Sequence, residues 1–189
     1  MLKGTPIIDA TVFMGMHHDD EVIRTRSLAF FTHRYDSQVR MSFSQIGICD
    51  AIIWKKEREL QDVYYPFMDV LHSDMNILRS GYSDAVLKRA AHSPELSALP
   101  PEKRLQAAQV LEGAGLFYTH DVEYHSCMAL KPYLATFDDP APPQDYVASP
   151  SHLISFDSPP RAKRFPSELQ KLYDVSLALT ITDEDFQHV

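Results

Sequence analysis

The chain has 189 residues, 44% of them apolar, which suits a single domain with a full hydrophobic core. Its 26 acidic and 18 basic residues give a formal charge of -8, which argues against non-specific coating of nucleic acid. That charge does not exclude a nuclease, because a metal site collects carboxylates. No segment approaches the roughly 20 apolar residues needed to cross a bilayer, and two cysteines are too few for a disulfide framework or zinc cluster. We expect a cytoplasmic domain that does not contact a membrane.

The first 55 residues alternate between apolar runs and helical patterns. Residues 6–13 predict a buried strand that runs into a loop, and residues 39–41 predict a second strand. A helix is expected over 21–34, and another begins after the N-cap Ser42 and runs through Ile53. This order predicts parallel strands joined by right-handed crossovers.

The middle of the chain is expected to be helical. Apolar residues at 3.6-residue spacing predict a helix over 60–78, and two shorter helices are expected near 83–92 and 101–112. Pro66 should kink or split the first of them. The last should close at Gly113 or Gly115, since glycine favours helix ends.

The C-terminal part combines shorter elements with a proline-rich stretch. We expect a helix through 124–130, strands at 134–137 and 175–181, a candidate strand at 153–156, a helix at 167–172 and a frayed acidic tail. Together the elements predict one α/β domain over 1–189, with three α/β/α layers around a mostly parallel sheet of 4–5 strands. The extra helices occupy about 60–112, and a proline-rich insertion occupies about 140–166.

Acidic residues stand where parallel strands would end. Asp9 follows Pro6-Ile7-Ile8, Asp138 follows the strand at 134–137, and Asp121 opens a helix that should face the same edge. Ligands of open parallel sheets bind at this edge. Carboxylates gathered there repel one another unless a cation neutralises them. An all-oxygen site would suit Mg²⁺ or Mn²⁺.

Three segments resemble the PIN-domain superfamily. They are Ile7-Ile8-Asp9-Ala10-Thr11-Val12-Phe13, the segment from His120-Asp121 to Leu130, and Leu134-Ala135-Thr136-Phe137-Asp138-Asp139. Their order and the short gap between the last two also match that family. The resemblance covers about residues 5–139 and implies a PIN-like fold.

The resemblance further implies a Mg²⁺- or Mn²⁺-dependent ribonuclease. Carried over by position, Asp9, Asp121 and Asp138 would be the catalytic metal-site acids, and Asp139 would be a fourth ligand or would orient the loop. The metal would polarise a phosphate oxygen and lower the pKa of the attacking water. The expected partners are an RNA or nucleotide substrate and an antitoxin-like or other pathway protein, and a homodimer is one option.

The chain departs from the family at one acid. The family has a Glu roughly six residues, or almost two helical turns, after the Ser or Thr that follows the second strand. Counting from Ser42 leads to Ile48. Asp50 lies roughly 200° further round the helix, and Gln45 would be a weak ligand. The site is therefore incomplete, relocated or inactive.

Other residues have weaker signals. Thr11 is a candidate to hold water or phosphate, and His125 lies one turn after Asp121 on the same helix face. Both also have ordinary structural interpretations. The basic run of Arg161, Lys163 and Arg164 is a candidate to follow a nucleic-acid backbone, or is simply solvated.

Two alternative functions stay open. The first is a PIN-like scaffold that has lost catalysis and serves as a binding or regulatory protein, as the absent Glu suggests. The second is a haloacid-dehalogenase-type phosphatase with Asp9 as nucleophile. That motif requires a second Asp where this chain has Thr11.

Overall fold

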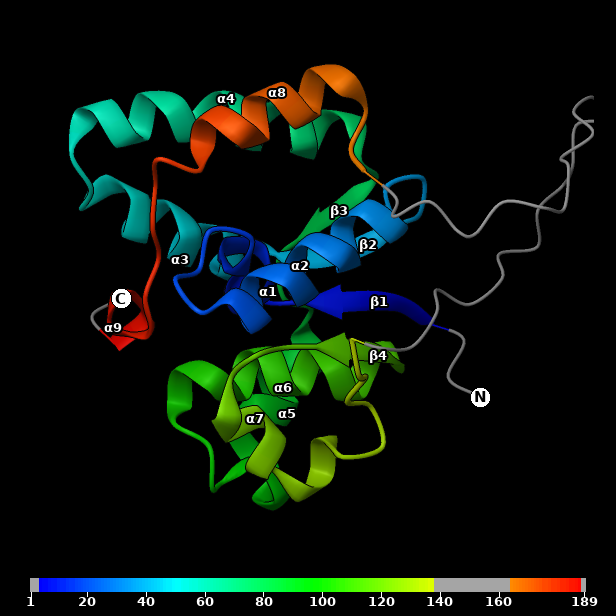
Figure 1. Ribbon diagram of the computed structural model, residues 1–189. Helices are drawn as coiled ribbons and strands as arrows, with labels where there is room; N and C mark the ends of the chain where they lie inside the picture. The colour runs from blue at the N-terminus through cyan, green and yellow to red at the C-terminus, as the bar shows by residue number, and fades with distance from the viewer. Residues whose placement is uncertain (1–3, 138–163, 188–189) are drawn as a thin grey trace, which may run out of the picture.

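The computed structural model describes residues 4–137 and 164–187. Its centre is a parallel four-stranded sheet in the order β3-β2-β1-β4 (Figure 1). The strands are β1 Gly4–Ile8, β2 Val39–Ser42, β3 Ile77–Ser80 and β4 Gly115–Tyr118. Helices flank this sheet, which confirms the predicted α/β class with a central parallel sheet.

Helices pack on both faces of the sheet. One face carries α1 Ala10–Gly15, α2 Glu21–His33, α3 Phe43–Trp54, α4 Arg58–Asp74, α8 Ser167–Ser176 and α9 Asp183–Gln187. The other carries α5 Asp84–His92, α6 Pro101–Gly113, α7 Val122–Ser126 and the short 3₁₀ turns Pro94–Leu96 and Met128–Leu130. In Figure 1 the helices α5, α6 and α7 lie together beside β4, whereas α4 and α8 lie side by side at the far end.

The alternation of side chains along β1 and β4 builds two hydrophobic cores. Ile8 and Tyr118 are paired in register and face the core formed with α1–α4 and α8. Ile7 and Phe117, one residue earlier, face the core formed with α5–α7. Because successive side chains of a strand point to opposite faces, these strands are apolar on both sides. The cysteines Cys49 and Cys127 are buried and free.

The sequence placed several elements correctly. The helices predicted over 21–34, 83–92 and 101–112 and the strand over 39–41 are confirmed to within one residue at each end. Ser42 is the N-cap of α3 and accepts a hydrogen bond from the backbone N–H of Gln45. None of the helices in the two described ranges combines the length and apolar character needed to cross a bilayer.

The prediction of one strand over 6–13 was wrong beyond Ile8. The chain turns at Asp9, whose carboxylate caps α1 by accepting hydrogen bonds from the backbone N–H groups of Thr11 and Val12. Nearly every residue of α1 is buried. A helix that is apolar all round leaves no periodicity to distinguish it from a buried strand.

The prediction of one helix over 60–78 was also wrong at its end. Helix α4 stops at Asp74, and Ile77 and Leu78 begin β3. Pro66 neither splits nor ends α4. It lies on the exposed face of the helix, where water can satisfy the carbonyl that its missing N–H leaves unpaired.

The C-terminal predictions needed more correction. Strand β4 was not predicted, and the expected strand at 134–137 is reduced to a single bridge between Leu134 and Phe117. The expected helix through 124–130 is divided into α7 and the 3₁₀ turn Met128–Leu130.

The expected strand at 175–181 was wrong, because α8 extends to Ser176 and Ile181 only bridges to His18. The acidic tail forms α9. The candidate strand at 153–156 lies outside the described residues.

Candidate metal centre at the carboxyl edge of the sheet

Asp9 is the buried centre of the site, with 1% of its surface exposed. Its Oδ1 accepts hydrogen bonds from the Thr11 hydroxyl at 2.6 Å, the Thr11 N–H at 3.0 Å and the Val12 N–H at 3.2 Å. Its Oδ2 accepts one from the Thr119 hydroxyl at 2.5 Å. The turn from β1 into α1 thus fixes this carboxylate at the end of β1.

Asp121 reaches the same place from the neighbouring strand. It follows β4 and caps α7, with its Oδ1 accepting from the Glu123 N–H at 2.9 Å. Its own N–H donates to the Thr119 hydroxyl at 2.9 Å. Thr119 therefore joins the two acids, as expected for residues at the ends of adjacent parallel strands.

The buried position of Asp9 changes the pKa of its carboxyl group. Burial raises the pKa of Asp9 to about 6; the hydrogen bonds from Thr11 and Thr119 oppose this shift, and the nearby charge of Asp121 adds to it. A carboxyl with such a pKa gains or loses its proton near neutral pH.

A lysine supplies a counter-charge. The Lys103 ammonium, from α6, donates to Asp121 Oδ2 at 2.5 Å and also bonds the Glu123 carboxylate. It lies 5.7 Å from the centre of the Tyr124 ring, within cation–π range. Burial opposes its charge, but the hydrogen bonds with Asp121 and Glu123 outweigh burial and raise the pKa of Lys103.

Gln45, not an acid, stands beside Asp9 on α3. Its side-chain carbonyl accepts the Ala10 N–H at 2.9 Å, and only 6% of the residue is exposed. Ile48, at the position where the family has its Glu, packs against the core. The structure therefore brings Gln45 to the site in a capping role.

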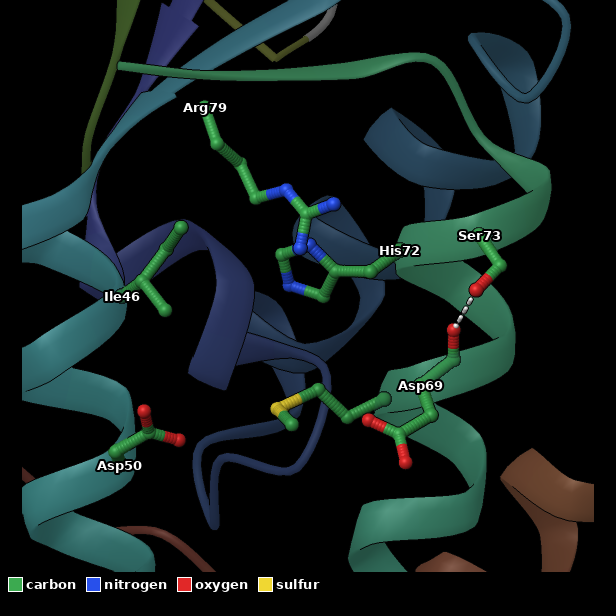
Figure 2. Close-up of a pocket in the computed structure, with 7 residues that line it drawn as sticks. Ile46, Asp50, Asp69, His72, Ser73 and Arg79 are labelled. Atoms are coloured by element: carbon green, nitrogen blue, oxygen red, sulfur yellow. Dashed lines mark hydrogen bonds between the residues drawn. The ribbon is translucent and has the colours of Figure 1, made fainter.

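Asp50 is placed elsewhere. It lines a cavity of about 510 Å³ between α3 and α4, whose other lining residues are Ile46, Met68, Asp69, His72, Ser73 and Arg79 (Figure 2). Burial, and then the charge of Asp69, raise the pKa of Asp50. Neither Asp9 nor Asp121 lines this cavity, so Asp50 does not replace the family's Glu.

The other predicted residues support the acids or stand apart from them. The Thr11 hydroxyl donates to Asp9 and accepts the His120 N–H at 2.9 Å, which makes it a positioning group. His125 bonds the Thr119 carbonyl through Nε2 at 3.0 Å and is otherwise exposed. Arg164 is exposed. Asp138, Asp139, Arg161 and Lys163 lie outside the described residues.

Sequence reasoning missed Thr119 and Lys103, and it assigned no role to His120. Thr119 had a signal, because it directly precedes the His120-Asp121 pair. Lys103 had none, since it comes from a helix 18 positions before Asp121. His120 stacks on Phe137, with ring centres 4.4 Å apart, and bonds Ser27 at 2.9 Å. Burial, the main cause, lowers its pKa to about 4.

The described residues fit a magnesium ion only in part. They contain no group of three or more His, Cys, Asp or Glu side chains arranged around one metal position. Mg²⁺ is commonly held by one or two carboxylates, with waters and substrate phosphates completing its shell. Asp9 Oδ2 accepts one hydrogen bond and retains a lone pair for a cation. Asp9 and Asp121 can thus supply two ligands.

The fold and the acid pair define an α/β domain with a polar, carboxylate-containing site at the edge where ligands of parallel sheets bind. A family model described as "Family of unknown function (DUF6190)" matches residues 1–186, and the chain belongs to this family. No curated protein and no solved structure matches the chain.

Proposed function

We propose that this DUF6190 protein is a PIN-like, divalent-metal-dependent ribonuclease. The observation that carries the proposal is that the Thr119 hydroxyl bonds both the Asp9 carboxylate and the Asp121 backbone N–H at the carboxyl edge of the sheet. A fold alone does not define a reaction, so the argument depends on this site. The resemblance of the three acidic segments to PIN domains supports it.

In this proposal Asp9 and Asp121 hold Mg²⁺ or Mn²⁺, and Asp138 and Asp139 are the candidates to complete the set. When bound, the metal would supply charge for the phosphate oxygens and lower the pKa of the attacking water. The chain's own residues orient these ligands. Thr11 and the first turn of α1 fix Asp9 Oδ1, and the Thr119 hydroxyl fixes Oδ2.

The phosphatase alternative is disfavoured by the surroundings of Asp9. A nucleophilic carboxylate needs an oxygen that can approach phosphorus. Oδ1 already accepts three hydrogen bonds and Oδ2 accepts a short one from Thr119, in a residue only 1% exposed. These four hydrogen bonds hold the carboxylate in place, which disfavours its attack on phosphorus.

A second candidate function is a PIN-like binding or regulatory protein without catalysis. Two observations favour it: the side chain that α3 places next to Asp9 is the neutral Gln45, and Lys103 is bonded to Asp121. Lys103 neutralises negative charge that a metal would otherwise neutralise, and Gln45 contributes no negative charge to attract a metal. Such a protein would act through a protein or nucleic-acid partner.

The deciding experiment is RNA cleavage by the purified protein in EDTA, Mg²⁺ and Mn²⁺. Asp9→Asn removes the ligand charge but keeps the shape of the side chain, and Asp36→Asn, at an exposed position, is the matched control. Cleavage that requires metal, persists in Asp36→Asn and is lost in Asp9→Asn supports the ribonuclease. A folded protein that cleaves no RNA under any condition favours the second candidate. Growth arrest on expression would identify a toxin.

A further inference from the structure

Lys103 occupies an unusual position for a cation. It is the third residue of α6, which begins at Pro101, so its charge lies in the first turn of that helix. The helix dipole disfavours positive charge in this first turn. Its place is therefore explained by the acids of α7, to which its ammonium is bonded.

The contacts of Lys103 with these acids are unequal. Asp121 is the more buried partner, with 15% of its side chain exposed, while Glu123 is 48% exposed and Lys103 is 25% exposed. The two oxygens of Asp121 are both engaged, Oδ1 by the Glu123 N–H and Oδ2 by the ammonium. A divalent ion at Asp121 would meet the ammonium on the same carboxylate.

Two cations so close together repel one another. Metal binding therefore requires the ammonium to leave Asp121 Oδ2. Glu123 gives it an outer position to move to, because that carboxylate lies nearer to solvent and already bonds Lys103. The exchange would separate the charges without stranding a buried ammonium.

We propose that Lys103 is an internal counter-ion that competes with the divalent metal for Asp121 and sets the metal concentration at which the site fills. This inference rests on the proposed metal site. It concerns the regulation of that site and does not require cleavage.

The test is Mn²⁺ binding by isothermal titration calorimetry to the full chain at low ionic strength. Lys103→Met keeps the length of the side chain and removes its charge, and Lys88→Met is the matched control on the exposed face of α5. We expect Lys103→Met to bind Mn²⁺ at least about tenfold more tightly, which corresponds to about 1.4 kcal/mol. Lys88→Met and the charge-conserving Lys103→Arg should bind like the wild type.

Further variants show whether the gain in Mn²⁺ affinity depends on Asp121, and they provide an alternative if Lys103→Met does not fold. In the Lys103→Met/Asp121→Asn double variant the gain should disappear, and a gain that persists would overturn the inference. Lys103→Gln serves the same purpose as Lys103→Met if the latter does not fold. The Mn²⁺-induced rise in melting temperature gives a second readout and should be larger in the neutral variants.

The outcomes separate this inference from the proposed function. If the wild type and Lys103→Met bind Mn²⁺ equally, Lys103 is not the counter-ion, although the metal site remains. If neither binds, both the inference and the proposed metal site fail. If only the neutral variants bind, the inference stands and explains a wild-type protein that cleaves RNA poorly.

Discussion

The Thr119 hydroxyl donates a hydrogen bond to Asp9 Oδ2 over 2.5 Å, and this contact joins residues 110 positions apart in the chain. The same hydroxyl accepts the backbone N–H of Asp121. One side chain thus satisfies the buried carboxylate that follows β1 and orients the acid that follows β4. The site is consequently part of the packing between these two strands.

Replacing Thr119 by Val should destabilise the fold. The change keeps the shape of the side chain but leaves Asp9 Oδ2 and the Asp121 N–H without this partner. An unsatisfied buried group costs about 1–3 kcal/mol, and more when it is charged. Urea denaturation should therefore show at least that loss for Thr119→Val. Thr180→Val, at an exposed position, is the control and should change stability by less than about 0.5 kcal/mol.

The free energy of unfolding should depend on pH because Asp9 titrates. Burial raises its pKa from 3.8 to about 6, so the folded state binds this proton more tightly than the unfolded state does. The stabilising contribution is complete below about pH 4 and disappears as the pH rises through 6. With 1.36 kcal/mol per pKa unit, its size is on the order of 3 kcal/mol.

Comparison with Asp9→Asn isolates this contribution, because the variant cannot titrate there. Between pH 4 and pH 7 without metal, the wild type should lose stability relative to Asp9→Asn. The free energies of unfolding are measured by denaturant titration at each pH. A difference that does not vary with pH would contradict a raised pKa at Asp9.

Gln45→Glu tests whether the position beside Asp9 can accept the missing acid. The carboxylate can still accept the Ala10 N–H, but at pH 7 it adds negative charge next to Asp9 at a position where the native Gln45 is only 6% exposed. We expect a lower melting temperature in EDTA and a larger Mn²⁺-induced rise than in the wild type. Gln187→Glu, at an exposed position of α9, should change neither quantity. Equal Mn²⁺ responses in Gln45→Glu and the wild type would exclude Gln45 from the metal position.

The acid pair was predictable because its signal is local. Asp9 follows a short apolar run and Asp121 opens a helix, and parallel strands bring such ends together. The role of Gln45 and the bond from Lys103 to Asp121 depend on how α3 and α6 pack. This packing cannot be predicted from the spacing of residues in the sequence. The same limit applies to Asp50, whose direction depends on the fit of α3 against α4.

The two missed strands have a similar explanation. Strands β3 and β4 have four residues each. Each follows a helix after a very short connection, so the apolar residues of β3 continued the helical spacing of α4. Four residues are too few to establish a period of two. Pairing with β2 and β1 defines these segments as strands, and that pairing is a tertiary contact.

A substitution at Gly115 distinguishes the predicted helix end from the observed start of β4 by its effect on stability. It begins β4, paired with Gly4 of β1, and a Cβ added to it would lie 2.3 Å from the backbone oxygen of Thr5. Neighbouring backbone cannot move away cheaply, so Gly115→Ala should cost at least about 1–3 kcal/mol. If Gly115 only ended a helix, the substitution would have a far smaller effect.

Gly47 gives the matched comparison for this prediction. It lies within α3, and apart from its own helix backbone and chain neighbours a Cβ there would meet no atom within 4 Å. Gly47→Ala should therefore stabilise the protein by about 0.5–1 kcal/mol, since alanine loses less backbone entropy in a helix. Thermal or urea denaturation of both variants should show opposite signs. If Gly115→Ala were as stable as Gly47→Ala, the close approach of β1 and β4 that brings Asp9 to Asp121 would be wrong.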